Sequence, residues 1–189
     1  MSLKEKIRKK ICHKDEEKML RLFKSVLKNE KTILDVGCGS CKFSNKIQKR
    51  FNVKLRGIDI VEPKEKIIKF DLFDGETIPF KDNAFDAVLF VNVLHHTDTQ
   101  NKLIKEALRV SKKSVFIKDH YYENKKQLFI LKTADKLGNF LTNTKTPFLF
   151  KSLQDWDKLV DENNGEKILW KSKLTEKIYI PQIMVKLNK

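Results

Sequence analysis

The stretch of sequence that decides the fold is ILDVGCGSCKFS, residues 33–44. An apolar run with the character of a buried strand leads through Asp35 to a Gly-x-Gly turn, and a helical pattern begins a few positions later. Glycine at positions 37 and 39 allows a tight turn and lets a ligand lie against the backbone without a Cβ in the way. The segment therefore predicts a strand, a turn that binds a small molecule, and a helix.

Outward from this segment, short apolar runs alternate with helical patterns. The runs have the length and composition of buried parallel strands, and they fall at residues 33–36, 54–60, 87–91 and 114–117. Helical periodicity over Ser44–Phe51 and Lys102–Val110 connects them as βαβ crossovers. The sequence thus predicts an α/β fold with a doubly wound, mostly parallel sheet. Two tail strands, 167–171 and 177–187, would close one edge as an antiparallel hairpin.

The 189 residues suit a single domain. We divide the chain into an N-terminal helical flank, a ligand-binding half, a helical insertion or lid, and C-terminal strands, at residues 1–29, 30–120, 121–165 and 166–189. In the insertion, helices are expected over 125–137 and from Ser152 to Val160. The aromatic residues of the insertion either line a pocket or pack it onto the sheet; they are Tyr121, Tyr122, Phe129, Phe140, Phe148 and Phe150.

A net charge of +15 raises the question of a nucleic-acid or anionic-membrane partner. Only five of the 40 basic residues are arginine, the residue preferred for bidentate recognition of phosphates and bases. The composition therefore does not favour a nucleic-acid partner. No apolar run is long enough to span a membrane, no signal peptide opens the sequence, and three cysteines cannot form a disulfide framework. We expect a cytoplasmic protein with reduced thiols.

Details around the glycine turn indicate the kind of ligand. The dinucleotide fingerprint requires a third glycine where Lys42 stands. Asp35 would repel a diphosphate and attract an ammonium group. Asp59 ends the second strand, at the position where a carboxylate accepts hydrogen bonds from two ribose hydroxyls. The pattern predicts a nucleoside with a positively charged end that carries no phosphate.

That description fits S-adenosylmethionine, and the sequence resembles the class I S-adenosylmethionine-dependent methyltransferases. The nearest group is methyltransferase type 11, which includes ubiquinone-biosynthesis-like enzymes. The resemblance covers roughly residues 30 to 120 and rests on four blocks in order: LDVGCG (34–39), GIDI (57–60), DGETIPFKDNAFD (74–86) and NVLHH (92–96). Each block alone is weak, but four in order at suitable spacing are specific. The resemblance implies a seven-stranded, Rossmann-like sheet and S-adenosylmethionine as cofactor.

The resemblance also implies nine cofactor-binding positions. The methionine end would be held by Asp35, Gly37, Cys38, Gly39 and Asn92, the ribose by Asp59, a face of the adenine by Ile60, and the adenine amino group by Asp74 with Gly75 beside it. Asp74 has two alternatives: it can cap a turn, and Asp71 can make the adenine contact instead. Cys41 departs from the glycine or alanine of many relatives, and a small thiol should be tolerated there.

Methyl transfer from a sulfonium is an in-line displacement in which a general base is optional. A histidine near the reaction centre suits that role, because its pKa lies near neutrality. His96 and His120 are the candidate catalytic residues and His95 a weaker one; each can instead anchor a loop. The pair Cys38 and Cys41 has no second pair of ligands nearby in the sequence, so no metal site is predicted.

The acceptor is expected to be a small molecule, hydrophobic or aromatic, methylated at oxygen, nitrogen or carbon. Enzymes that methylate adenine or glutamine amino groups carry a [D/N/S]-P-P-[Y/F] tetrapeptide after the fourth strand, and residues 92–95 read NVLH instead. Two alternatives stay open. One is methylation of RNA or of an RNA-associated protein through the basic surface, and the other is a subunit that binds the cofactor without catalysis.

Overall fold

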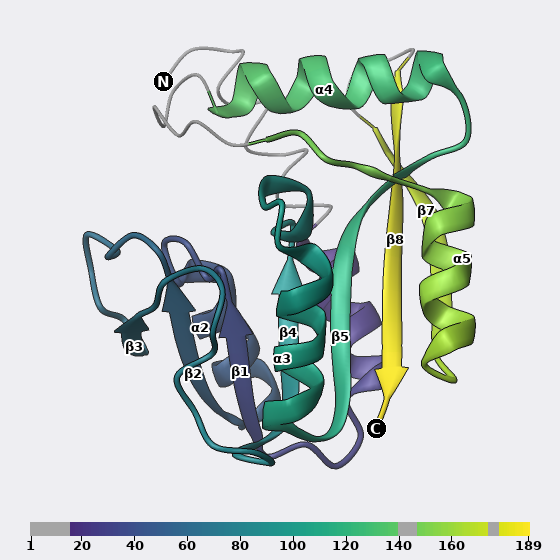
Figure 1. Ribbon diagram of the computed structural model, residues 1–189. Coiled ribbons are helices and arrows are strands. Elements are labelled where there is room, and N and C mark those ends of the chain that lie inside the picture. Colours follow the sequence, from purple (N-terminus) through teal and green to yellow (C-terminus); the bar gives the residue numbers. More distant parts are fainter. Residues whose placement is uncertain (1–15, 140–146, 174–177) are drawn as a thin grey trace.

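The computed structural model describes residues 16–139, 147–173 and 178–189, in which helices cover both faces of a twisted sheet (Figure 1). The strands are β1 (Thr32–Val36), β2 (Lys54–Asp59), β3 (Lys69–Leu72), β4 (Phe85–Val91), β5 (Ser111–Tyr122), β7 (Glu166–Lys173) and β8 (Tyr179–Asn188). They lie in the order β3-β2-β1-β4-β5-β8-β7. A two-residue strand, β6 (Lys151–Ser152), pairs with β5 outside this path.

The five strands β1 to β5 run parallel, whereas β8 is antiparallel to β5 and β7 is antiparallel to β8. The doubly wound sheet and its C-terminal hairpin are thus confirmed. The chain winds outward from β1 in one direction to β3 and, after crossing back, in the other direction from β4. Val36 at the end of β1 pairs with both Ile58 and Phe90, so the carboxyl ends of three strands meet at this switch point, where open α/β sheets bind ligands.

Helices occupy most of the connections. They are the helix of residues 16–26, α2 (Lys42–Phe51), α3 (Gln100–Val110), α4 (Lys125–Asn139) and α5 (Leu153–Glu162), with a 3₁₀ turn, η1 (Leu94–His96). Helix α4 lies across the carboxyl edge and packs against β5 and β8 (Figure 1). Helix α5 begins as predicted at Ser152, whose hydroxyl accepts from the amide of Asp155 in a capping box. None of the helices in the described ranges is long and apolar enough to cross a membrane.

Two layers of apolar side chains hold the helices to the sheet. One layer joins α3 and α5 to the sheet face that carries Leu34, Val88 and Phe90. The other joins the helix of residues 16–26 and α2 to the face that carries Ile33 and Leu89. Successive residues of β1 and β4 therefore enter opposite layers, because side chains alternate along a strand. This double burial explains why both strands read as continuous apolar runs in the sequence.

Some sequence expectations need correction. Strand β3 is not predicted by its residues, because two of its positions are exposed, the other two are only partly buried, and they show no apolar run. Of the aromatic residues in the insertion, Tyr121 does not line a pocket: β5 continues to Tyr122, and Tyr121 packs in the core. Phe129 on α4 is 71% exposed. Residues 1–15 of the predicted helical flank and Phe140 lie outside the described residues.

The guanidinium of Arg109 closes the loop between β3 and β4. It donates to the backbone oxygens of Ile78 (3.0 Å) and Phe80 (2.8 Å). It also pairs with the carboxylates of Glu106 and Asp82, each at 2.8 Å. We expect Arg109→Ala to lower the free energy of unfolding by about 2 kcal/mol, because charged hydrogen bonds are lost and loop carbonyls lose their donor. Urea unfolding followed by circular dichroism measures the change.

Arg50→Ala is the matched control. Arg50 forms an exposed ion pair with Glu17 (3.3 Å), and such pairs contribute less than about 1 kcal/mol. Equal losses in the two variants would contradict the role given to Arg109.

Candidate functional site

The glycine turn, residues 37–39, folds over the end of β2. The amides of Gly37 and Cys38 donate to the backbone oxygen of Ile58 at 2.8 and 3.2 Å. A Cβ on Gly37 would lie 2.6 Å from the side chain of Val93, so the absence of a side chain at Gly37 makes room for Val93. A Cβ on Gly39 would have nothing within 4 Å. Gly39, with φ +52°, is therefore the position that leaves open space for a ligand.

The thiols of Cys38 and Cys41 point toward the rest of the protein and not toward the open side of the turn. A Cβ on Gly57 would lie 2.6 Å from Sγ of Cys38, and that sulfur lies 3.3 Å from Sγ of Cys41. Burial raises the pKa of both thiols, and the negative charge of Asp35 adds to the effect, so both stay protonated. What Cys38 offers a ligand is its backbone.

Asp59 joins the ends of β1 and β2. Its Oδ2 accepts from the amide of Gly39 (2.7 Å) and its Oδ1 accepts from the amide of Val61 (3.2 Å). A carboxylate has about four acceptor positions, so Asp59 retains the capacity to bind hydroxyls. The neighbouring Ile60 is 57% exposed, and a Cβ on Gly75 would lie 3.1 Å from it. The fold thus brings Asp59, Ile60 and Gly75 together.

The two candidate carboxylates after β2 differ in their surroundings. Asp71 is paired with the guanidinium of Arg56 through both of its oxygens. Oδ1 of Asp74 caps a turn by accepting from the amides of Glu76 (2.8 Å) and Thr77 (2.7 Å), and these bonds lower the pKa of Asp74. Asp74 therefore does cap a turn, and both oxygens of Asp71 already bind Arg56.

Asp35 is buried at the end of β1. Its Oδ2 accepts from the hydroxyl of Ser44 on α2 (2.5 Å), and its Oδ1 has no hydrogen-bond partner. Burial raises the pKa of Asp35 to about 7, the bond from Ser44 opposes this shift, and the charge of Asp59 adds to it. A buried carboxyl oxygen without a partner, beside a glycine turn, fits a ligand that carries an ammonium group.

Asn92 directly follows β4 in a left-handed conformation, with φ +57°. Its amide donates to the backbone oxygen of Lys118 (2.8 Å), and its Oδ1 accepts from Nζ of Lys118 (2.5 Å). Lys118 is only 5% exposed. The Asn92 side chain is therefore fixed from β5, and nothing in the sequence pattern indicated that this lysine is buried.

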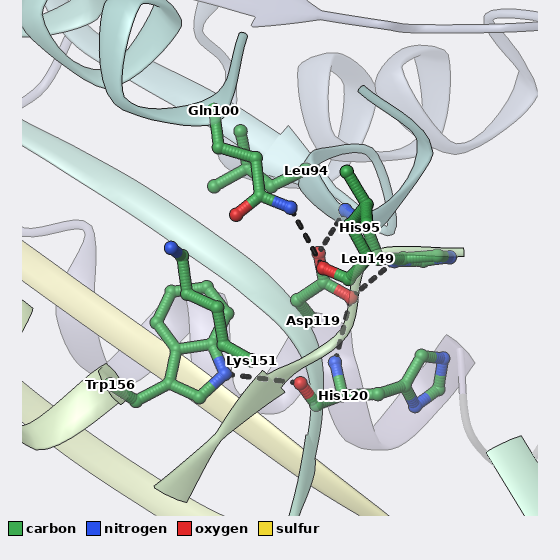
Figure 2. Close-up of a pocket in the computed structure, with 8 residues that line it drawn as sticks. All are labelled: Leu94, His95, Gln100, Asp119, His120, Leu149, Lys151 and Trp156. Atoms are coloured by element: carbon green, nitrogen blue, oxygen red, sulfur yellow. Dashed lines mark hydrogen bonds and ion pairs between the residues drawn. The ribbon is translucent and has the colours of Figure 1, made fainter. Parts of the chain in front are cut away.

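Three histidines and Asp119 lie close together, just after β4 and near the end of β5; Figure 2 shows His95, His120 and Asp119. Nδ1 of His95 lies 2.5 Å from Oδ1 of Asp119, and both side chains are buried. The rings of His95 and His96 are 3.9 Å apart, and those of His95 and His120 are 5.6 Å apart. The ring of Phe150 stacks on His95 at 4.6 Å. The two predicted catalytic histidines are thus brought together around His95.

The histidines differ in protonation. Burial would lower the pKa of His95, but the carboxylates of Asp119 and Asp135 outweigh burial and raise it to about 9. Burial would likewise raise the pKa of Asp119, but His95 lowers it to about 2. The pKa of His96 is lowered by burial and by the charge of His95, and the pKa of His120 is lowered to about 3 by burial and by Lys118. Hence His95 is charged at neutral pH, and the other two are neutral.

Helix α4 and the segment around Leu149 cover these histidines, and we call these two segments the roof. Oδ2 of Asp135 on α4 lies 3.7 Å from a ring nitrogen of both His95 and His96. The amide of Leu149 donates to the backbone oxygen of His95 (2.9 Å). A small pocket lies beside His95 and His120, and Figure 2 shows its lining residues Leu94, His95, Gln100, Asp119, His120, Leu149, Lys151 and Trp156.

Sequence reasoning missed the two acidic residues of this cluster. Asp119 ends a buried run directly before His120, a position comparable to Asp35 and Asp59, and this was a signal that could have found it. Asp135 lies on a lysine-rich helix with no distinguishing pattern. Only the packing of α4 over the sheet edge brings Asp135 to the histidines.

Asp35 makes the stability of the fold depend on pH. Its pKa is about 7 in the folded protein, against 3.8 for an unperturbed carboxyl. Between about pH 4 and pH 7 the unfolded chain has lost this proton while the folded chain retains it, so the contribution of Asp35 to the free energy of unfolding falls as the pH rises. The buried, neutral His120 contributes with the opposite sign over the same range. We expect a fall of up to about 4 kcal/mol, because each tenfold change in the acid dissociation constant corresponds to about 1.4 kcal/mol. We expect Asp35→Asn to remove this contribution, so that the stability of the variant relative to the wild type rises from pH 4 to pH 7.

Urea unfolding across this pH range measures the slope. Asp161→Asn, which changes an exposed carboxylate, is the control and should retain the wild-type slope. If Asp35→Asn also retained it, the pH dependence would come from other groups.

Comparison with known proteins identifies the family. The family model of the methyltransferase domain, type 11, matches residues 34–117. The protein MJ1123 of Methanocaldococcus jannaschii is 32% identical over 162 residues, which cover 70% of this chain and 76% of that protein. Ajmaline N-methyltransferase of Rauvolfia serpentina is 30% identical over 97 residues, which cover 44% of this chain and 33% of that enzyme.

A tRNA (carboxymethyluridine(34)-5-O)-methyltransferase of Arabidopsis thaliana is 28% identical over 142 residues, which cover 71% of this chain and 32% of that enzyme. The chain thus spans about a third of each plant enzyme. Magnesium protoporphyrin IX methyltransferase of Synechocystis PCC 6803, solved with bound S-adenosylhomocysteine, shares the fold with a TM-score of 0.67 at 14% identity, covering 100% of this chain and 89% of that one. The chain belongs to the class I S-adenosylmethionine-dependent methyltransferases, whose methyl donor is S-adenosylmethionine.

Proposed function

We propose that this methyltransferase acts on a small organic acceptor that binds beneath α4, next to His96 and His120. The observation that carries the proposal is the roof over the acceptor side, where Asp135 of α4 lies 3.7 Å from two histidine rings. Phe148 and Phe150 pack against the same histidines. A roofed site with aromatic walls favours a small apolar or aromatic molecule over a folded macromolecule.

On the donor side, we assign the cofactor to the glycine turn and the neighbouring strand ends. When bound, S-adenosylmethionine supplies an electrophilic methyl group for in-line displacement. The unpartnered oxygen of Asp35 would accept from its ammonium group, and Asp59 would accept from the ribose hydroxyls. Ile60 and Asp74 would flank the adenine. The other assigned residues would contact the cofactor through their backbone or, in one case, through a side-chain amide. The backbone contacts would come from Gly37, Cys38, Gly39 and Gly75, and the side-chain amide from Asn92.

The donor and acceptor sides share a boundary at Val93. The side chain of Val93 packs on Gly37 of the turn, and the 3₁₀ turn η1 that carries His95 and His96 begins with the next residue. This arrangement supports placing the acceptor's nucleophilic atom beside the histidines and the methyl donor beside the glycine turn.

His120 would bind the acceptor directly. Its Nδ1 lies 3.3 Å from the backbone oxygen of Pro181, and because a carbonyl only accepts, Nδ1 carries the proton. Nε2 is then left as a hydrogen-bond acceptor on a neutral ring. Such a nitrogen would orient a hydroxyl or amine so that its lone pair meets the methyl group.

The arginines argue against RNA as the acceptor. Arg56 is bound to Asp71, Arg109 to Glu106 and Asp82, and Arg50 to Glu17. In the described part of the chain, three of the four arginines are therefore neutralised by carboxylates of the protein itself. They leave few guanidinium groups for phosphate recognition.

Gly39→Ala tests the cofactor side. The new methyl group would enter the open space at the turn, so we expect binding of S-adenosylhomocysteine to weaken at least about tenfold, measured by calorimetry. The left-handed backbone should cost about 1 kcal/mol of stability. Asn52→Ala is the matched control, because Asn52 has φ +50° at the end of α2, away from the turn. Equal affinity in Gly39→Ala and the wild type would remove the turn from the cofactor site.

His120→Phe tests the acceptor side. We expect kcat to fall about a hundredfold while the affinity for S-adenosylhomocysteine stays unchanged, because the ring volume remains and only its nitrogens are lost. Phe129→Ala, at an exposed position of α4, should retain full activity. A parallel loss of cofactor affinity in His120→Phe would contradict a role confined to the acceptor.

The acceptor class is tested with S-adenosylmethionine labelled in its methyl group. The protein is incubated separately with a small-metabolite fraction and with total RNA, and each product is counted. We expect label in the metabolite fraction. Label in RNA would overturn the small-molecule proposal. RNA is included because the Arabidopsis relative is named as a tRNA methyltransferase.

A further inference from the structure

Three side chains at the acceptor side form a set of metal-ligand groups: His95, His96 and Asp135. One ring nitrogen of each histidine and one carboxylate oxygen all lie within 4.8 Å of one another. Oδ2 of Asp135 is 3.7 Å from Nε2 of His95 and 3.7 Å from Nδ1 of His96. We propose that this cluster binds a divalent transition-metal ion, for which Zn²⁺ is the probe.

The distances between Asp135 and the two histidine rings suit a shared metal ion better than direct hydrogen bonds. Ligand atoms on a tetrahedral Zn²⁺, with bonds of about 2.0–2.1 Å, lie roughly 3.3 Å apart. The two distances of 3.7 Å exceed this value by a few tenths of an ångström and exceed the usual length of a hydrogen bond. The three ligand atoms lie within 4.8 Å of one another, so side-chain rotations would have to draw them closer around an ion.

His96 supplies the second observation. Its Nδ1 is buried and has no hydrogen-bond partner, although Asp135 is the nearest carboxylate. Buried ring nitrogens are normally satisfied by a partner. A bound metal ion would satisfy this one, because a neutral imidazole nitrogen is a ligand as it stands.

His95 is already held as a ligand would be. Its Nδ1 lies 2.5 Å from Asp119, and that carboxylate also accepts from the amide of His120 (2.7 Å). Metal-ligating histidines typically donate their other ring nitrogen to a carboxylate, which fixes the ring and the tautomer. Asp119 would thus be the positioning residue, and Nε2 of His95 the coordinating atom. Because His95 is charged at neutral pH, the ion would displace the proton of Nε2, which is released to solvent.

The ligand set also indicates what the ion would do. Two imidazoles and one carboxylate suit Zn²⁺ and other first-row divalent ions, and three protein ligands leave a position open for a further ligand. In the role that rests on the proposed function, the ion binds the oxygen or nitrogen of the acceptor there and lowers its pKa. His96 then acts as a metal ligand, while His120 contacts the acceptor.

This site differs from the sequence expectation that no metal is bound. That expectation considered Cys38 and Cys41, whose sulfurs lie 3.3 Å apart. Burial keeps both of these thiols protonated, and they do not belong to a set of three ligands among the described residues. The test must still separate the two locations.

The experiment titrates the metal-free full chain with Zn²⁺, without cofactor or acceptor, in competition with a chromophoric chelator. We expect one Zn²⁺ per chain. His96→Ala and Asp135→Ala should each weaken binding by about tenfold or more, and Asp119→Asn by about ten- to a hundredfold. Asp98→Ala is the matched control, because it removes an exposed carboxylate two residues after His96 and should retain wild-type affinity. Circular dichroism of each variant verifies folding.

Cys38→Ser combined with Cys41→Ser separates the two locations and should retain the ion. Substitution with Co²⁺ gives a second readout: a spectrum without sulfur-to-metal charge transfer supports the histidine site. The proposal is overturned by absence of Zn²⁺ binding, by unchanged affinity in both His96→Ala and Asp135→Ala, or by loss of the ion in the cysteine variant. Because binding is measured without substrate, failure of the small-molecule proposal would leave this result standing, and the reverse also holds.

Discussion

A parallel sheet buried on both faces can present polar groups only where its strands end. In this protein β1 and β4 carry apolar side chains into two core layers, and the polar residues follow at their carboxyl ends. The bond from the amide of Gly39 to Asp59 joins the ends of β1 and β2 (2.7 Å). The position of the glycine turn, and with it the open space beside Gly39, depends on this contact.

Two buried carboxyl groups at that edge show how a partner decides protonation. Asp119 has a cation within the chain, His95 at 2.5 Å, and its pKa is lowered to about 2 despite burial. Asp35 has only the hydroxyl of Ser44, and burial raises its pKa to about 7. Asp119 thus forms a charge pair within the chain, whereas Asp35 has no cationic partner at the edge where we propose that the cofactor binds.

Much of the fold was predictable, because its signals are local. The segment 33–44 contains a strand, a turn and the start of a helix, and the capping residue Ser152 indicates where α5 begins. The candidate site was only partly predictable, since its contacts join distant parts of the chain. The burial of Lys118 against Asn92 and the approach of Asp135 to the histidines depend on packing that no local pattern encodes. A glycine pattern likewise shows that space is needed at Gly37, but not that Val93 fills it.

The contact between Gly37 and Val93 gives an ordinary apolar side chain, Val93, a structural role. Val93 is the spacer between the bend after β1 and the turn η1, which follow two paired strands. Its bulk sets how far apart the two stand. A homologue with a side chain of another size at this position would hold the glycine turn and η1 at a different spacing.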